Sequence, residues 1–204
     1  MKPFHSVRGP VAVLDRTDVD TDQIIPKQFL KRIERTGFGE FLFFDWRFDS
    51  AGALRPDFEL NDPDTAGAKI LIAGANFGCG SSREHAAWAL EDYGFEAVVA
   101  PSFGDIFAMN CFKIGLVTIV LPPAELRPLI ASVGRGAFAE VDLERQLIVD
   151  PTGREIPFDF DPFQRHCLLN GLDDIARSLT HEDRIEAYEA SHPARVSTTA
   201  LAAT

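Results

Sequence analysis

The sequence has few cysteines, and no two of them are close together. Cys79, Cys111 and Cys167 are the only three, and no Cys-x-x-Cys pair occurs. A small secreted domain held by disulfides would need a denser, even set, so this class of protein is excluded. The spacing also lacks the ligand patterns of zinc and iron–sulfur sites. It favours reduced thiols and therefore predicts a cytoplasmic location.

Long hydrophobic runs and an excess of basic charge are also missing. The longest apolar run, residues 114–123, is too short to span a bilayer, and residues 1–6 lack the apolar core of a signal peptide. The chain carries 20 Lys and Arg against 31 Asp and Glu, a formal net charge of −11. A nucleic-acid-binding protein needs a basic face. We therefore predict that neither a membrane nor a nucleic acid is a partner.

The common nucleotide-binding and hydrolase motifs are absent too. Gly78 and Gly80 begin a Gly-x-Gly-x-x-Gly pattern, but Arg83 stands where the third glycine is required. The sequence contains no Gly-Lys-Ser/Thr of a phosphate-binding loop and no Gly-x-Ser-x-Gly elbow of a hydrolase.

What is present is the composition of an ordinary globular protein. Of the 204 residues, 46% are apolar and 25% are charged. This length favours one domain with a sizeable core. We predict that the domain covers residues 1–192. Residues 193–204 show no amphipathic pattern and are predicted to form a flexible C-terminal tail.

Strand and helix patterns alternate through the middle of the chain. Apolar runs bounded by turn residues predict strands at residues 69–74, 97–100 and 117–121. Helices are predicted at residues 81–93, 103–112 and 123–133. This alternation indicates an α/β core with parallel strands. Further strands are expected at 11–14, 140–143, 147–149 and 155–158, and further helices at 161–170 and from Thr180 onward, with Thr180 as N-cap.

The densest group of reactive side chains lies in residues 78–85 (GCGSSREH), between a predicted strand and a predicted helix. Ligands of open α/β sheets bind beyond the carboxyl ends of the strands, where helix N-termini offer free N–H groups. Arg83 could hold a carboxylate through two parallel hydrogen bonds. However, Ser81 and Glu84 also form a capping-box pattern, so a purely structural role explains the segment equally well.

Two nucleophile arrangements remain open in this segment. Ser81 and His85 are four residues apart, so one helical face could carry both as a dyad. The favoured alternative for His85 is a histidine packed against the sheet. Cys79 near a helix N-terminus could have a lowered thiol pKa, and the alternative is a buried, inert thiol. A stand-alone hydrolase would use Ser81 or Cys79 with His85.

Several segments resemble one known family. Residues 76–86 (NFGCGSSREHA) are similar to the active-site signature of the swivelling domain in the aconitase superfamily, and residues 20–26 (DTDQIIP) resemble its second marker. Residues 35–39, 45–48 and 165–173 narrow the resemblance to the bacterial small subunits of 3-isopropylmalate dehydratase. The resemblance covers the chain as far as residue 192.

This resemblance implies a fold, an activity and a partner. The fold is a three-layer β/β/α swivelling domain of the aconitase C-terminal type. The activity is that of a heteromeric hydro-lyase, which isomerises 2-isopropylmalate and 3-isopropylmalate via 2-isopropylmaleate in leucine biosynthesis. A separate large subunit holds a 4Fe–4S cluster, and this chain itself binds no cofactor or metal. A homoaconitase or citraconate-type hydratase subunit remains an alternative, as does a non-catalytic subunit that docks a partner through residues 38–48. In the heteromeric enzyme, the Phe-rich residues 38–48 are expected to form part of the contact with the large subunit, and the alternative is a strand in the core of this chain.

The resemblance also implies roles for single residues. Ser81 is the expected general base, and Ser82 and Arg83 are expected to contact a small dicarboxylate substrate. Three residues are expected to support the site: Asp22, Gly80 and His85.

The basic cluster in residues 27–37 is expected to add a substrate contact. Lys31, Arg32 and Arg35 compete for this role, with Arg35 as the provisional choice, and the alternative is a solvated charged turn. Leu30 or Ile33 could face the isopropyl group of the substrate.

Overall fold

The computed structural model describes residues 1–31 and 36–192. Within these residues, seven strands form one sheet in the order β4-β3-β2-β1-β5-β6-β7. The central strand, β1 (Ser6–Leu14), pairs in parallel with β2 (Ile70–Ala73) and antiparallel with β5 (Phe138–Asp142). The sheet therefore has a parallel half and an antiparallel half that meet at one strand.

The parallel half has the strand–helix alternation that the sequence predicts. Its strands β2, β3 (Ala97–Ala100) and β4 (Val117–Val120) are connected by α3 (Glu84–Tyr93) and α4 (Asp105–Ile114). Both helices end at a glycine in the left-handed region, which costs glycine little because it has no Cβ. Every residue of β2 and β3 is buried, as expected for parallel strands covered on both faces.

The antiparallel half packs against one face of the parallel half. It contains β5, β6 (Leu147–Val149) and β7 (Glu155–Pro157), accompanied by α5 (Pro123–Ser132) and α6 (Pro162–Asn170).

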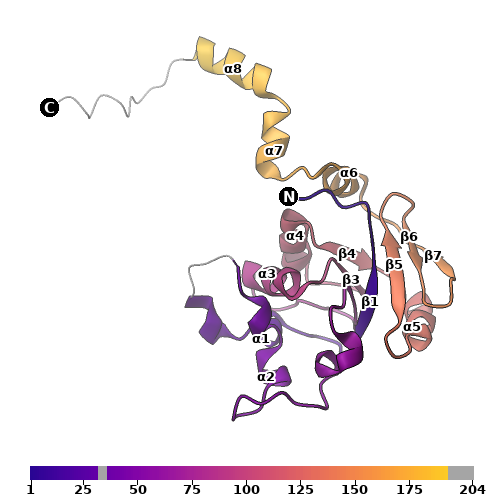
Figure 1. Ribbon diagram of the computed structural model, residues 1–204. Helices are drawn as coiled ribbons and strands as arrows, with labels where there is room; N and C mark the ends of the chain where they lie inside the picture. The colour runs from indigo at the N-terminus through magenta and orange to yellow at the C-terminus, as the bar shows by residue number, and fades with distance from the viewer. Residues whose placement is uncertain (32–35, 193–204) are drawn as a thin grey trace.

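The layers follow from which way successive strand residues point. Ile70 and Ile72 lie in one core cluster with residues of β5, β6 and β7, whereas Leu71 and Ala73 lie in the other with residues of α3 and α4. Since neighbouring strand residues point to opposite faces, the parallel strands form the middle layer. Figure 1 shows α3 and α4 on one side of β1 and the antiparallel strands on the other. The predicted three-layer β/β/α arrangement is confirmed.

The connection from β1 to β2 consists of short helical turns. They are α1 (Thr21–Ile24), α2 (Phe44–Arg47) and the 3₁₀ turns η1 (Lys27–Lys31), η2 (Gly39–Phe41), η3 (Glu59–Asn61) and η4 (Pro63–Thr65). The Phe-rich residues 38–48 belong to this connection, and the side chains of Phe38 and Phe43 are completely buried. Part of this segment is therefore core of this chain and cannot contact a partner.

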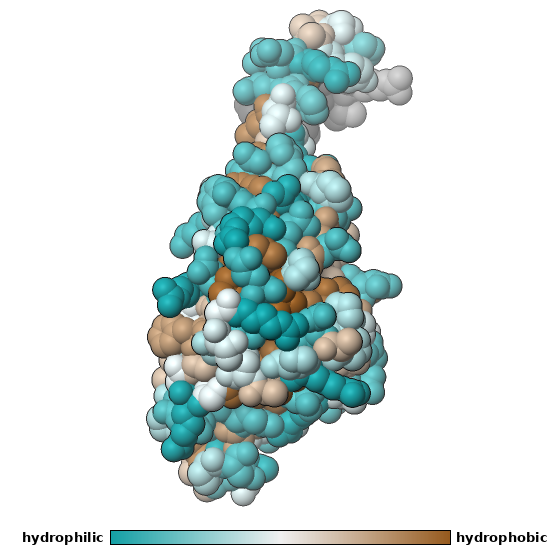
Figure 2. All heavy atoms as spheres, turned by 90° about the vertical axis from the view of Figure 1, so that its right-hand side faces the viewer, coloured by the Kyte–Doolittle hydropathy of each residue, from teal (hydrophilic) through white to brown (hydrophobic). Residues whose placement is uncertain are grey.

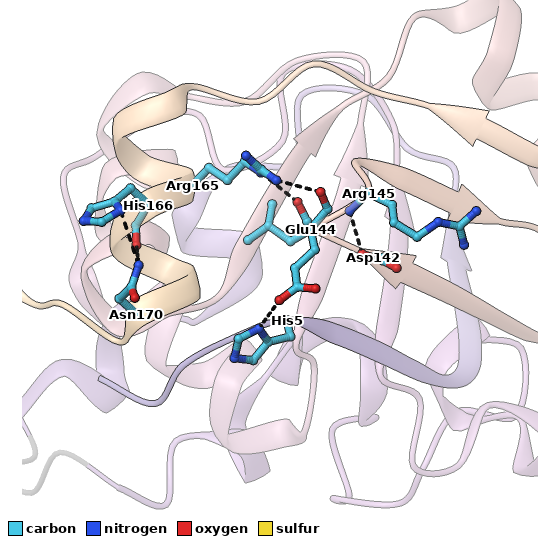
Figure 3. Close-up of polar contacts among 8 residues, drawn as sticks. His5, Asp142, Glu144, Arg145, Arg165, His166 and Asn170 are labelled. Carbon is cyan, nitrogen blue, oxygen red and sulfur yellow. Dashed lines mark hydrogen bonds and ion pairs between the residues drawn. The ribbon is translucent and has the colours of Figure 1, made fainter.

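α6 is tied to the turn between β5 and β6 (Figure 3). Nε and Nη2 of Arg165 donate hydrogen bonds to the carbonyl oxygens of Leu143 (3.0 Å) and Glu144 (2.6 Å). Nδ1 of His5, at the start of the central strand, lies 2.7 Å from Oε1 of Glu144. Arg165, which opens segment 165–173, thus joins α6 to the antiparallel layer.

The helical C-terminal end differs from the sequence prediction. Thr180 is not an N-cap: it ends α7 (Asp174–Leu179), a helix that the sequence analysis missed, and α8 (Glu182–Ser191) begins after His181. The missed signal is Asp173, whose carboxylate accepts a hydrogen bond from the Ala176 N–H and so begins α7.

α7 and α8 form an arm that contains no buried residue. The arm extends away from the body in Figure 1, and its surface in Figure 2 is mostly hydrophilic. The predicted tail, residues 193–204, lies outside the described residues. In the part of the chain that the structure describes, no helix is both long and apolar enough to cross a membrane.

Candidate active site

Three loops meet at the carboxyl edge of the parallel strands. Residues 15–20 follow β1, residues 74–83 follow β2, and residues 101–104 follow β3. Bridges join Asp20 to Cys79 and Phe77 to Phe103. The two segments that carry the family resemblance, residues 20–26 and 76–86, are therefore neighbours in space, although the 49 residues 27–75 separate them in sequence.

Two glycines give the loop after β2 its shape. Gly78 has a φ of 74° and Gly80 a φ of 93°, a region that other residues rarely adopt. A Cβ on Gly78 would lie 2.2 Å from the ring of Phe107. Gly78 thus allows close packing on α4, and Gly80 turns the chain immediately before Ser81.

We expect Gly78→Ala to destabilise the protein by about 2–4 kcal/mol, because left-handed strain and a steric clash add together. Urea unfolding would measure this change. Gly134→Ala is the matched control: Gly134 has no heavy atom within 4 Å of its Cβ position and no positive φ. Equal midpoints for the two variants would contradict the packing argument.

Ser81 lies in the loop and not in the helix. α3 begins at Glu84, its N-cap is Arg83, and no side chain caps it. The capping box predicted from Ser81 and Glu84 is therefore wrong. The partner of Ser81 is Thr21 instead, whose Oγ1 lies 3.1 Å from the Ser81 Oγ.

Thr21 was not singled out by the sequence analysis. It is only 1% exposed, and its Oγ1 also accepts a hydrogen bond from the Ser81 N–H at 3.2 Å. The available signal was its position inside residues 20–26, where the two aspartates on either side of it draw attention first.

Arg83 forms an ion pair with Asp22, in which Nη1 of the guanidinium contacts Oδ1 of the carboxylate. The Arg83 side chain is 21% exposed and the Asp22 side chain 53%. The structure thus brings Asp22 against Arg83, and the supporting role of Asp22 stays a prediction. The neighbouring Ser82 is exposed at the surface of the same loop.

His85 packs among aromatic side chains. Its ring lies 5.2 Å from that of Phe38, edge-on, and 4.7 Å from that of Trp88. Burial lowers the pKa of the His85 imidazole, and this effect is opposed by the nearby Glu84 carboxylate. Since Ser81 precedes the helix, the helical face predicted to carry both Ser81 and His85 does not exist.

Cys79 does not have the environment of an activated thiol. Burial raises its pKa, and the negative charges of Asp20 and Asp18 raise it further. Of the two interpretations of Cys79, the activated thiol at a helix N-terminus is wrong, because α3 begins five residues later.

The cysteines are too dispersed to ligate one cluster. Cys111 is buried in the core cluster beneath α3 and α4, whereas Cys167 is buried in the cluster on the opposite face of the sheet. Burial also raises the pKa of the Cys111 thiol well above its usual range. Among the described residues, no group of three His, Cys, Asp or Glu side chains could hold a metal ion. This donor set does not fit an iron–sulfur cluster.

The basic cluster is described only in part. Arg32, Ile33 and Arg35 lie outside the described residues. Lys31 is exposed at the end of η1, and the neighbouring Leu30 is half-buried. The choice of Arg35 as a substrate contact therefore stays a prediction.

The fold and the paired loops define a swivelling domain of the aconitase type. In agreement, the family described as the aconitase C-terminal domain matches residues 1–124, and the family LeuD_N matches residues 134–162.

The similarity to individual named proteins defines a narrower family than this class. The chain is 56% identical over 201 residues to the 3-isopropylmalate dehydratase small subunit of Methylibium petroleiphilum, covering 93% of each chain. It is 55% identical over 190 residues to that of Bacillus subtilis, covering 93% of this chain and 96% of the relative. The crystal structure of 3-isopropylmalate dehydratase from Methanocaldococcus jannaschii matches with a TM-score of 0.65 and 27% identity, covering 90% of this chain and 99% of that one. The chain belongs to the family of 3-isopropylmalate dehydratase small subunits.

Proposed function

We propose that this chain is the small subunit of a cytoplasmic hydro-lyase that interconverts 2-isopropylmalate and 3-isopropylmalate via 2-isopropylmaleate in leucine biosynthesis. The observation that carries this proposal is the identity of more than half of the residues over 93% of the chain with proteins of that name. The meeting of the two marker segments at one edge of the sheet supports it.

Ser81 is the proposed base. In the dehydration, its oxygen takes the carbon-bound proton while the hydroxyl group leaves the neighbouring carbon. In the rehydration, the hydroxyl group is added to the carbon that lost the proton, and a proton is added to the carbon that lost the hydroxyl group. A serine hydroxyl is a weak base at neutral pH, so the alkoxide needs hydrogen-bond donors that are already in place. The loop after β2 holds Ser81 in a fixed position at the carboxyl edge of the sheet.

Arg83 and Ser82 are the proposed contacts of the substrate carboxylates. A guanidinium presents two parallel N–H donors to a carboxylate, a geometry that a lysine ammonium cannot copy. The Asp22 carboxylate keeps the guanidinium oriented before substrate binds. Since Asp22 is more than half exposed, solvent weakens this pair, and the substrate can compete for Arg83.

We expect Arg83→Lys to raise KM for isopropylmalate and to lower kcat/KM at least tenfold, although the charge is kept. Steady-state kinetics of the assembled enzyme would measure both. Arg145→Lys is the control, because Arg145 pairs with Glu155 on the antiparallel layer. Unchanged kinetics in Arg83→Lys would leave Arg83 with a purely structural role.

The departing hydroxide requires a Lewis acid, which this chain does not supply from its described residues. We assign it to a 4Fe–4S cluster on a separate large subunit, whose metal would polarise the leaving hydroxyl group. The name small subunit, shared by the relatives, supports the existence of that partner.

A substrate panel tests the proposed function. The chain, co-expressed with a candidate cluster-bearing large subunit and purified without oxygen, should convert 2-isopropylmalate into 3-isopropylmalate. Homoaconitate and citraconate, tested at equal concentration, should react much more slowly. If the complex prefers homoaconitate or citraconate, that compound and not isopropylmalate is its substrate. A complex that is inactive on all three would contradict the proposed function.

A further inference from the structure

Thr21 is one of three buried polar side chains in the described part of the chain, together with Asn110 and Asp150. Asn110 belongs to α4, and Asp150 follows β6. Asp150 is satisfied within its own turn by Thr152 and Arg154. The Thr21 hydroxyl, in contrast, is directed at a residue sixty positions away, and nothing in the resemblance gives it a role.

The Thr21 hydroxyl contacts three atoms of a single residue. Its Oγ1 lies 3.2 Å from the Ser81 nitrogen, 3.1 Å from the Ser81 Oγ and 3.3 Å from the Ser81 carbonyl oxygen. A threonine hydroxyl has one proton to donate and lone pairs to accept with. The Ser81 N–H can only donate, so it occupies a lone pair of Thr21. The single proton of Thr21 is left with two acceptors, the Ser81 carbonyl oxygen and the Ser81 Oγ.

The two acceptors correspond to two states of Ser81. While Ser81 carries its proton, either hydroxyl can donate to the other, or Thr21 can donate to the carbonyl oxygen. Once Ser81 is an alkoxide, its Oγ can only accept. A small rotation of the Thr21 hydroxyl then brings its proton onto that oxygen. A hydrogen bond to an ionised acceptor is about twice as strong as one between neutral groups, so this contact stabilises the alkoxide more than the resting serine.

We infer that Thr21 is a positioning residue, whose hydroxyl holds Ser81 in place and donates its proton to the Ser81 oxygen when that oxygen is ionised. This inference rests on the proposed role of Ser81 as the base. It names a donor for the alkoxide, and it explains why a buried hydroxyl faces an exposed serine.

The surrounding structure holds Thr21 rigidly. Its own N–H donates to the carbonyl oxygen of Cys79 at 2.9 Å. Asp20 and Gln23 form a complete capping box around it: the Asp20 carboxylate accepts from the Gln23 N–H, and the Gln23 side chain accepts from the Asp20 N–H. The branched Cβ of threonine further restricts its side-chain rotation. A donor fixed in this way needs little reorganisation when charge develops on Ser81.

Two substitutions separate the hydroxyl from the shape of the side chain. Thr21→Val removes the hydroxyl and keeps the volume, whereas Thr21→Ser keeps the hydroxyl and removes a methyl group. In the assembled enzyme, we expect Thr21→Val to lower kcat about 10- to 100-fold, as the loss of a hydrogen bond to a charged group would. KM should change by less than about twofold, and Thr21→Ser should keep most of the activity.

An isotope effect distinguishes this role from a purely structural one. With isopropylmalate deuterated at the carbon that loses its proton, Thr21→Val should show a larger primary isotope effect on kcat than the unmodified enzyme, because proton removal becomes slower. Thr65→Val is the matched control: its hydroxyl donates only to the backbone oxygens of Glu59 and Asp62. This variant should leave both kcat and the isotope effect unchanged.

The outcomes distinguish the inference from the function on which it rests. A wild-type complex without isomerase activity overturns the proposed function and this inference together. A Ser81→Ala variant that keeps the activity leaves the function in place and overturns the role of Ser81 as the base, and this inference with it. Thr21→Val with unchanged kcat and isotope effect overturns the inference alone. So does an equal loss in Thr21→Val and Thr21→Ser, which would indicate a structural tie. The double variant of Ser81→Ala and Thr21→Val should be no slower than Ser81→Ala, and an additional loss would show that Thr21 acts independently of Ser81.

Discussion

Ser81→Ala is expected to lower kcat of the assembled enzyme by about a thousandfold or more, while the complex with the large subunit still forms. The reason is that no other residue of the loop after β2 can take its place. Arg83 is paired with the Asp22 carboxylate, the Cys79 pKa is raised, and the His85 ring packs among aromatic rings. Steady-state assays with gel filtration of the complex would measure turnover and assembly separately.

Ser132→Ala is the control for this substitution. Its hydroxyl donates to the carbonyl oxygen of Leu129 on α5, in the other core cluster, so the activity should be unchanged. If Ser81→Ala keeps activity within about tenfold of the wild type, the lost barrier stabilisation is only about 1.4 kcal/mol. Such a loss is too small for the residue that removes the proton.

The purified chain alone is expected to be colourless, free of stoichiometric iron and inactive on isopropylmalate. Adding a cluster-loaded large subunit without oxygen should restore turnover. The physical reason is that the described residues include the proposed base, Ser81, and the proposed carboxylate contact, Arg83, but no group of three His, Cys, Asp or Glu side chains that could hold a metal. Hydroxide is a poor leaving group without a Lewis acid. Iron analysis and a product assay, before and after mixing, would measure both properties.

The control for this reconstitution is the large subunit by itself, which should also be inactive because it lacks Ser81. Activity of the small chain alone, or stoichiometric iron on it, would contradict the divided site. A large subunit that is fully active alone would contradict it equally.

The Phe-rich residues 38–48 show where the sequence leaves two interpretations open. Aromatic residues are enriched both in cores and at the centres of interfaces. The structure buries Phe38 and Phe43 completely, while Phe44 and Phe48 stay half-buried with ring centroids 4.8 Å apart. The segment is also not a strand. Only its half-buried rings remain available to the proposed partner contact.

The parallel half of the sheet could be predicted because its signals are local. Each strand is a short apolar run, and the glycines that end α3 and α4 stand next to the last helical residue. Such patterns depend on neighbours a few residues away. The class of protein could be predicted for a related reason: each of the two markers, residues 20–26 and residues 76–86, is an unbroken stretch of the sequence.

The position of Ser81 could not be predicted from its neighbours. The capping pattern of Ser81 and Glu84 is a real local preference, and it predicts a helix from residue 81. In the folded chain, Gly80 turns the backbone and the buried Thr21 hydroxyl binds Ser81 instead, so α3 begins at Glu84. A tertiary hydrogen bond to a residue sixty positions away thus outweighs a local cap.

By itself, the sequence determined the α/β core, the family and the segment that carries Ser81, Ser82 and Arg83. The tertiary structure decided which residues surround that segment: Asp22 beside Arg83, Thr21 beside Ser81, and aromatic rings around His85. The physical reason is the range of the interactions. Helix and strand patterns depend on neighbours along the chain, whereas these contacts exist only because strand pairing brings the loops after β1 and β2 to the same edge of the sheet.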